Sequence, residues 1–223
     1  MATSKKYKLI RSKRRTIALA VAADASLVVR APMNTPVSYI ERLIETKLEW
    51  IRQAMARINS RPRPVAHEFV EGESFLHLGK TYKLRFDKKA TKKLEFKSAF
   101  IMSTRERKNA RSVLIAWYKK EAKTQITERV AWYAKRSGLS YGSIKITSAN
   151  RRWGSCSTSG NLNFSWKLIM APLWVVDYVV VHELAHLEHK NHSPTFWSRV
   201  KVMYPSYEKA KMWLKQNEGT LTI

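Results

Sequence analysis

The sequence predicts a mixed α+β fold, in which a β-rich N-terminal region with one helix precedes a helical core with a small sheet. Three observations predict this class. Short β-branched runs occupy the first half, and apolar residues recur every three or four positions in several later segments. The length of 223 residues leaves room for two small domains. We therefore expect an N-terminal region over residues 1–104 and a second domain over residues 105–223.

The N-terminal region alternates strands with one helix. A helix is expected to begin at Thr35-Pro36, with Thr as the cap and Pro at the first helical position. Apolar residues spaced by three and four continue it to Ile58, and Arg61–Pro64 is the expected linker. Strands are expected at Thr16–Val21 and Ser26–Arg30, as a hairpin, and within the stretch Phe69–Met102.

The second half reads as helices around a short pair of strands. From about Glu106 the apolar spacing predicts a long helix that ends at Ser137-Gly138. Strands at Ile144–Thr147 and Asn161–Trp166 flank a Gly/Ser-rich loop at Trp153–Gly160. The remaining helices are expected over Pro172–His189, from Ser193-Pro194 onward, and over Tyr207–Gln216.

Charge is the most unusual feature of the composition. There are 42 Lys and Arg against 17 Asp and Glu, a formal net charge of +25. Such an excess attracts polyanions, so nucleic acid or a nucleotide is a possible partner through the basic surface. The basic stretches Lys5–Arg15 and Lys80–Lys97 interleave cations with aromatic residues, although strands with exposed lysines have the same pattern.

The single cysteine, Cys156, cannot form an internal disulfide. The basic N-terminal segment lacks the apolar core of a signal peptide. The longest apolar run, Leu168–Val176, is too short for a membrane span. These features predict a cytoplasmic protein with no membrane association.

The most informative segment is His182-Glu183-Leu184-Ala185-His186. Residues i and i+4 share one face of an α-helix, so both imidazoles can bind one ion. The carboxylate of Glu183 lies one residue round the helix, where it reaches a water beside the ion rather than the ion. The apolar run Val179–Val181 predicts that this helix is buried, so its polar side chains need partners. The pattern therefore predicts a metal site.

A catalytic zinc site needs a third protein ligand and one open position. We expect this ligand to be His192, because Lys190-Asn191 ends the helix and lets the chain fold back from another direction. Glu208 is the alternative ligand, or it orients a ligand imidazole from outside.

Three motifs resemble those of the YgjP-like family of zinc metallopeptidases, which is similar to the SprT-like and WLM zincins. They are His182–Leu187, the segment His192–Trp197, and Arg152–Cys156 upstream. The resemblance implies a zincin-like core that holds one Zn²⁺ on His182, His186 and His192. It also implies Glu183 as the catalytic base and hydrolysis of peptide bonds in a polypeptide substrate.

Substrate contacts are less sharply defined by the sequence. The stretch Asn161–Trp166 alternates, with Leu162, Phe164 and Trp166 facing a core and with Asn161, Asn163 and Ser165 facing outward. It is either an edge strand to which a peptide adds or an internal strand with one wet face. Candidates for stabilising an oxyanion are Arg152, Tyr204 and Tyr207.

Two other functions use the same features. A nucleotide (NTP or UTP) pyrophosphatase would use the same metal site, and the positive charge would suit its substrate. However, the sequence has neither a phosphate-binding glycine loop nor a carboxylate cluster for magnesium. A DNA-associated protease would use the basic surface for recruitment, as the SprT-like and WLM relatives imply. Histidine ligation favours zinc and peptide hydrolysis.

Overall fold

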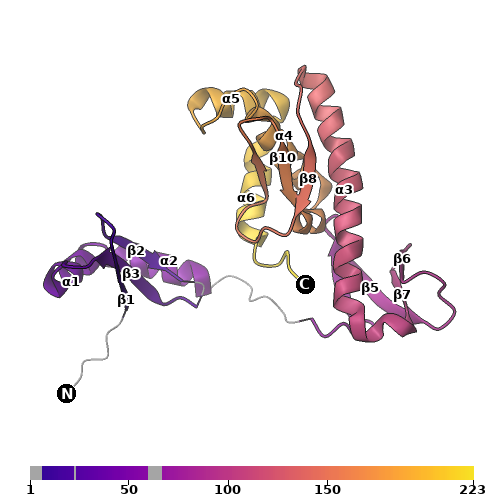
Figure 1. Ribbon diagram of the computed structural model, residues 1–223, viewed down its shortest axis with the longest axis horizontal. Coiled ribbons are helices and arrows are strands. Elements are labelled where there is room, and N and C mark those ends of the chain that lie inside the picture. Colours follow the sequence, from indigo (N-terminus) through magenta and orange to yellow (C-terminus); the bar gives the residue numbers. More distant parts are fainter. Residues whose placement is uncertain (1–6, 23, 60–66) are drawn as a thin grey trace. The chain divides into compact units, whose positions relative to one another are not determined.

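The computed structural model describes residues 7–22, 24–59 and 67–223. The protein divides into two compact units, unit 1 (Met1–Arg63) and unit 2 (Pro64–Ile223). Both combine helices with small sheets, which confirms the mixed α+β class (Figure 1). The predicted linker Arg61–Pro64 lies outside the described residues.

Unit 1 is a three-stranded sheet with two helices. The predicted hairpin forms between β2 (Ala18–Val21) and β3 (Leu27–Pro32). The sequence analysis missed β1 (Lys8–Ser12), which pairs in parallel with β3 and gives the order β1-β3-β2. Leu27, Val29 and Ala31 of β3 pack in one buried cluster with Ile40 and Ile51 of the helices.

The single helix expected in unit 1 is broken in the structure. It forms α1 (Val37–Thr46) and α2 (Leu48–Asn59), with Lys47 between them at φ −109° and ψ 11°. The expected cap was wrong by one residue, because Pro36 is the N-cap of α1 and makes no side-chain capping bond. The apolar spacing continues across the break, and spacing alone cannot reveal one non-helical residue.

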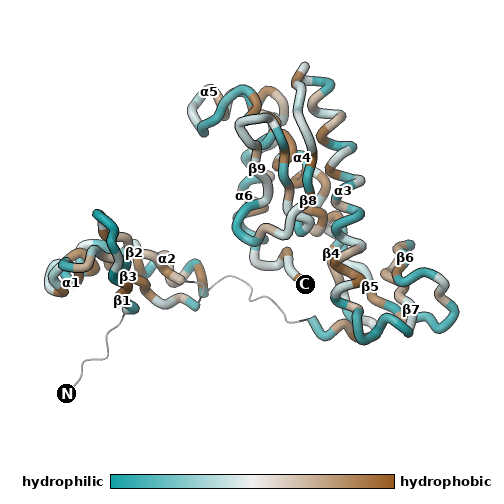
Figure 2. Tube along the Cα trace, viewed as in Figure 1, coloured by the Kyte–Doolittle hydropathy of each residue, from teal (hydrophilic) through white to brown (hydrophobic). Residues whose placement is uncertain are grey.

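Unit 2 is built around one long helix, α3 (Ala110–Ser137), which ends at Gly138 in the left-handed conformation as expected. Figure 1 shows α3 running from one small sheet to the other, and Figure 2 shows its turns alternating between hydrophilic and hydrophobic. The first sheet has the order β4-β5-β7-β6, with β4 (Ser74–His77), β5 (Lys80–Asp87), β6 (Leu94–Phe96) and β7 (Phe100–Ser103). A 3₁₀ helix, η1 (Thr104–Asn109), joins β7 to α3.

The predicted boundary between residues 104 and 105 is not where the structure divides the chain. The β4–β7 sheet belongs to unit 2, because Phe75 and Phe100 pack in the same buried cluster as Leu114 and Tyr118 of α3. The hydroxyl of Tyr118 also donates a hydrogen bond to the Leu76 carbonyl of β4. Strand content alone could not assign this stretch, since its partner is a helix that follows it in the chain.

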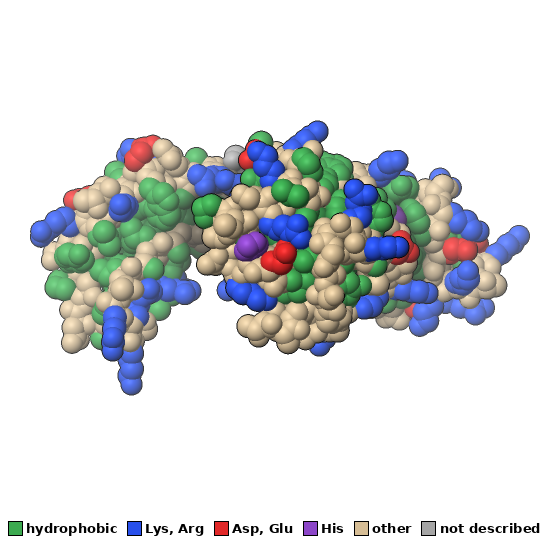
Figure 3. Space-filling view, turned by 90° about the horizontal axis from the view of Figure 1, so that it is seen from above, with side chains coloured by type: hydrophobic (Ala, Val, Ile, Leu, Met, Phe, Trp, Pro, Cys, Tyr) green, Lys and Arg blue, Asp and Glu red, His purple; other side chains and the backbone are tan. Residues whose placement is uncertain are grey.

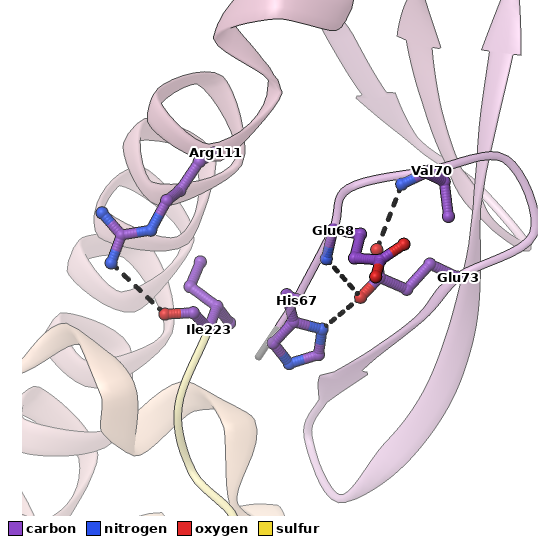
Figure 4. A network of polar contacts seen from close by, with 6 residues as sticks. All are labelled: His67, Glu68, Val70, Glu73, Arg111 and Ile223. Carbon is purple, nitrogen blue, oxygen red and sulfur yellow. Dashed lines mark hydrogen bonds and ion pairs between the residues drawn. The ribbon is translucent and has the colours of Figure 1, made fainter. Parts of the chain in front are cut away.

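Polar contacts hold both the first described residues of unit 2, from His67, and its C-terminal residue, Ile223. The Glu73 carboxylate accepts from the backbone N–H groups of Glu68 (3.2 Å) and Val70 (3.1 Å) and lies 2.7 Å from Nδ1 of His67, as Figure 4 shows. At the other end, Arg111 of α3 donates to the Ile223 carbonyl at 3.4 Å (Figure 4).

The second sheet of unit 2 has the order β8-β10-β9 and lies beside three helices. Its central strand β10 pairs in parallel with β8 and antiparallel with β9. The strands are β8 (Ile144–Thr147), β9 (Gly154–Cys156) and β10 (Leu162–Ser165), and a 3₁₀ helix, η2 (Trp166–Met170), follows. The helices are α4 (Leu173–Ala185), α5 (Pro194–Met203) and α6 (Tyr207–Asn217). β9 was expected to be part of a loop.

No helix in the described ranges is long and apolar enough to cross a membrane.

Candidate metal centre

Helix α4 carries the first part of the site. Most of its side chains are buried, including Val179, Val180 and Val181, which confirms the apolar helix expected from the sequence. It ends earlier than expected, because Ala185 is its last residue and His186 is its C-cap. His182 and His186 still lie one turn apart on the same face, with ring centroids 4.9 Å apart.

His192 reaches the same point from the connection between α4 and α5. Ser193 caps α5 by accepting from the Phe196 N–H, and this fixes where the preceding residue lies. The His192 ring centroid is 5.0 Å from that of His182 and 4.8 Å from that of His186. The three imidazoles therefore converge in space.

The three imidazoles form a donor set that can hold a metal ion. One ring nitrogen from each lies within 4.8 Å of the other two. Nε2 of His192 and Nε2 of His182 are 3.1 Å apart. Two nitrogens at about 2.0–2.1 Å from a tetrahedral zinc ion are separated by about 3.3 Å, so the spacing fits such an ion. Glu208, the alternative ligand, is not part of this cluster.

The surroundings orient these rings, and they keep the ring of His182 uncharged. Nδ1 of His186 lies 2.9 Å from the His189 carbonyl, and this contact puts the proton on Nδ1 and leaves Nε2 free to bind a metal. Phe196 packs on His186 with centroids 4.5 Å apart, and Trp197 stacks on His192 at 5.7 Å. Burial, reinforced by the neighbouring histidines, lowers the pKa of His182 to about 3, so its ring is neutral at pH 7.

Glu183 is buried beside this cluster, with 5% of its surface exposed. Burial raises the pKa of its carboxyl group to about 8, and the positive charge of Arg152 acts in the opposite direction. Arg152 therefore lies near the site as the sequence suggested, on the segment that leads into β9.

Gly154 of β9 makes room for the Glu183 carboxylate, and the sequence analysis missed this role. A Cβ atom on Gly154 would lie 2.5 Å from Oε1, 2.6 Å from Cγ and 2.8 Å from Cδ of Glu183. Only glycine allows the backbone of β9 to approach this side chain so closely. The signal in the sequence was a glycine between Trp153 and Ser155, which was assigned to a loop.

The two tyrosines expected near the site occupy different positions. The Tyr204 hydroxyl donates to the Trp174 carbonyl at 2.9 Å. Trp174 lies eight residues before His182, about 12 Å along α4, so this bond stabilises the far end of the helix. Tyr207 stacks on Trp197 at 5.5 Å, and its hydroxyl donates to Glu208 at 3.2 Å. Tyr207 therefore contacts Trp197, the ring that stacks on His192, rather than His192 itself.

The predicted substrate strand at Asn161, Asn163 and Ser165 is wrong as an edge. β10 is the central strand of its sheet, so both of its edges are already paired. The three polar side chains bind other parts of the protein: Asn161 accepts from Ser143, Asn163 donates to Ser155 of β9, and Ser165 donates to the Ala149 carbonyl. Alternation distinguishes the two faces of a strand but not an edge from a centre.

The prediction that the apolar side chains of this stretch face the core is confirmed. Leu162, Phe164 and Trp166 are all buried in the core of unit 2. Within the described residues β9 is the edge strand next to α4, because it pairs with β10 alone.

The chain belongs to the YgjP-like metallopeptidase domain family, whose model matches residues 15–217. It is therefore a metallopeptidase, and this family implies a metal cofactor and a polypeptide substrate. The resemblance found from the sequence motifs is confirmed. The match includes most of unit 1 as well as the metal centre.

Two solved structures show a weaker likeness. One is the metallopeptidase zymogen of Pyrococcus abyssi abylysin, with a TM-score of 0.39 and 16% identity over 44% of this chain and 99% of that chain. The other is the metallopeptidase zymogen of Methanocaldococcus jannaschii jannalysin, with a TM-score of 0.38 and 17% identity over 41% of this chain and 95% of that chain. A search of curated proteins found no match.

Proposed function

We propose that this protein is a zinc-dependent metallopeptidase with one Zn²⁺ per chain, bound by His182, His186 and His192, and with Glu183 as the general base. The observation that carries the proposal is the convergence of three imidazoles on one point, with Nε2 atoms of two of them 3.1 Å apart. A carboxylate buried beside them supports the assignment of a base. Imidazole ligation favours zinc over magnesium or calcium.

A zinc ion bound there would supply Lewis-acid polarisation of the scissile carbonyl and would acidify the attacking water. Its positive charge would favour the ionised form of Glu183, whose carboxylate would then take a proton from that water and deliver it to the leaving amine. Gly154 holds this carboxylate in place by letting β9 lie directly against it. Arg152, on the same segment, is the remaining candidate to stabilise negative charge in the transition state.

The substrate is proposed to bind as an extended strand along β9. Ser165 N–H donates to the Trp153 carbonyl at 2.8 Å, and Ser157 N–H donates to the Asn161 carbonyl at 2.9 Å. In an antiparallel ladder such pairs alternate, so the backbone groups of Gly154 and Cys156 point away from β10. They are available to pair with a polypeptide backbone.

The test compares wild type with Glu183→Gln on casein and on a quenched fluorescent peptide. We expect the variant to retain one zinc per chain and to lose at least about 10³-fold in turnover, as removal of a general base predicts. Metal analysis by mass spectrometry is the control that separates lost chemistry from lost metal. Full zinc occupancy with unchanged hydrolysis would refute Glu183 as the base.

The same preparations test the alternative substrates. Hydrolysis of nucleoside triphosphates without cleavage of casein would favour a pyrophosphatase. Binding to labelled DNA that weakens steeply with salt but is unaffected by Glu183→Gln would instead indicate a separate basic contact. Figure 3 shows Lys and Arg side chains spread over the visible face of the protein.

A further inference from the structure

Unit 1 has an apolar groove next to a strand edge. The groove has a volume of about 390 Å³ and is lined by Ile17, Leu19, Leu43, Lys47 and Trp50. Trp50 is 47% exposed, a large fraction for a tryptophan. Figure 3 shows hydrophobic side chains gathered over the visible face of unit 1, with Lys and Arg at its margins.

The strand beside the groove has unpaired backbone groups. The order β1-β3-β2 places β2 at an edge of its sheet, and no other described strand pairs with it. The Ala22 N–H donates to the Ser26 carbonyl at 2.8 Å, so in this antiparallel ladder Ala20 and Ala18 also face β3. The N–H and C=O groups of Leu19 and Val21 therefore point to the free edge.

The side chains that line the groove lie beside the free edge of β2. Leu19 lies opposite the buried Val29, so its side chain is on the sheet face that the helices cover. Leu43 of α1, Lys47 between the two helices and Trp50 of α2 line the other side of the groove. A strand added to β2 would place every second side chain over the space between these walls.

We propose that unit 1 binds an extended, acidic and apolar polypeptide segment, which adds to the free edge of β2 and inserts an apolar side chain between Leu19 and Trp50. A row of unpaired backbone donors and acceptors is complementary to another polypeptide backbone. The apolar walls select an aliphatic or aromatic side chain, and the ammonium group of Lys47 selects a neighbouring carboxylate. This binding goes beyond the proposed hydrolysis and does not depend on it.

The test uses the full chain carrying Glu183→Gln, so that the probe is not cleaved, and a fluorescein-labelled peptide that alternates Leu with Glu. Fluorescence anisotropy measures Kd. We expect Trp50→Ala to raise Kd at least about tenfold, as loss of a buried aromatic anchor predicts. Trp132→Ala is the matched control, because Trp132 is 45% exposed but belongs to α3, and it should leave Kd unchanged.

Two further measurements separate loss of peptide binding from a folding defect caused by Trp50→Ala. Lys47→Glu changes an exposed residue and should abolish the preference for the Glu peptide over a Leu-Lys peptide. N-methylation of alternate peptide amides should weaken binding to the unmodified groove about tenfold, because it removes the hydrogen bonds to β2.

The proposal is overturned if no peptide binds, if Trp50→Ala and Lys47→Glu leave Kd unchanged, or if both peptides bind equally well. It is also overturned if a single-stranded oligonucleotide, rather than the peptide, loses affinity in these two variants. Each outcome is read by anisotropy alone, so a failure of the hydrolase assignment would not affect it.

Discussion

The two units differ most in how much apolar side chain each removes from water. The buried cluster of unit 1 consists of Leu27, Val29, Ala31, Ile40 and Ile51. Unit 2 has one continuous cluster that includes residues of the β4–β7 sheet, α3, β10 and helices α4 to α6. Unit 1 nevertheless leaves large apolar side chains such as Met33, Tyr39 and Trp50 exposed.

This difference shows where each kind of site can exist. Burying Glu183 and His182 costs free energy, because both lose solvent, and only a large packed core can hold them in that position. A shallow binding surface needs no such core, because its apolar residues stay in contact with water until a partner arrives. The buried glutamate and histidine therefore lie in unit 2, whereas the apolar groove beside Leu19 and Trp50 lies in unit 1.

Of the variants that test the contrast between the two units, His192→Ala in unit 2 is expected to have the largest effect on zinc content and turnover. Loss of one of three ligands should remove most of the zinc at micromolar metal and reduce peptide hydrolysis by at least about 10³-fold. Metal content and turnover measure the effect. Since His192 is exposed and lies outside α4, we expect little change in the stability of the apo protein. Retention of full zinc occupancy would mean that another residue supplies the third ligand.

The second effect is expected from Gly154→Ala. The new Cβ would contact the Glu183 carboxylate at less than van der Waals distance, so we expect about 10²-fold lower kcat with zinc content and KM nearly unchanged. Gly72→Ala is the matched control, because Gly72 also lies in unit 2 and a Cβ there meets nothing within 4 Å. That control carries only the strain of a positive φ, +80°.

A double-mutant cycle separates contact with Glu183 from general misfolding. Gly154→Ala should destabilise the protein when Glu183 is present but not when Glu183 is replaced by Ala, because the smaller side chain leaves room for the Cβ. Chemical denaturation measures both differences. Equal destabilisation in the two backgrounds would show that the glycine is needed for the strand itself.

The third effect tests the core that supports α4. Arg129 of α3 binds Asp177 of α4 in a bidentate pair, with Nε–Oδ1 at 2.5 Å and Nη2–Oδ2 at 2.8 Å. Asp177→Asn should lower the free energy of unfolding of unit 2 by about 2 kcal/mol, since the half-buried guanidinium loses its counter-charge. Glu188→Gln, which breaks the more exposed pair with Arg199, should cost less than about 0.5 kcal/mol.

The smallest effect compares one substitution in the two units. Ile51→Val in unit 1 and Ile126→Val in unit 2 each remove one buried methylene, worth about 1 kcal/mol. We expect calorimetry to show two transitions, with Ile51→Val lowering only that of unit 1 and Ile126→Val only that of unit 2. A single transition that both variants shift equally would mean that the units unfold together.

Much of the fold followed from local patterns in the sequence. Helix α3 and its end at Gly138 followed from apolar spacing and a glycine cap, and α5 followed from Ser193-Pro194. The pairing of β1 with β3 could not be predicted, because it joins residues about twenty positions apart through backbone groups that every residue carries. For the same reason, assigning the β4–β7 sheet to unit 2 required the structure.

In the candidate site too, some residues followed from local sequence patterns and others were revealed only by the structure. His182, Glu183 and His186 followed from a five-residue motif, because helical geometry alone puts the two rings on one face. His192 followed from the expected end of α4. The contact between Gly154 and Glu183 was missed, because it depends on how β9 packs against α4. The sequence left open whether β10 is an edge or an internal strand, because its pairing with β8 and β9 joins distant segments.

By itself the sequence determined the helix that carries His182 and His186, the apolar faces of the long helices and the family to which the chain belongs, because each is encoded by residues that are neighbours along the chain. Only the tertiary structure decided that β9 is an edge strand, that Gly154 contacts the Glu183 carboxylate, and that the β4–β7 sheet belongs to unit 2. These depend on contacts between distant segments, whose partners are selected by packing of the whole core rather than by any local pattern.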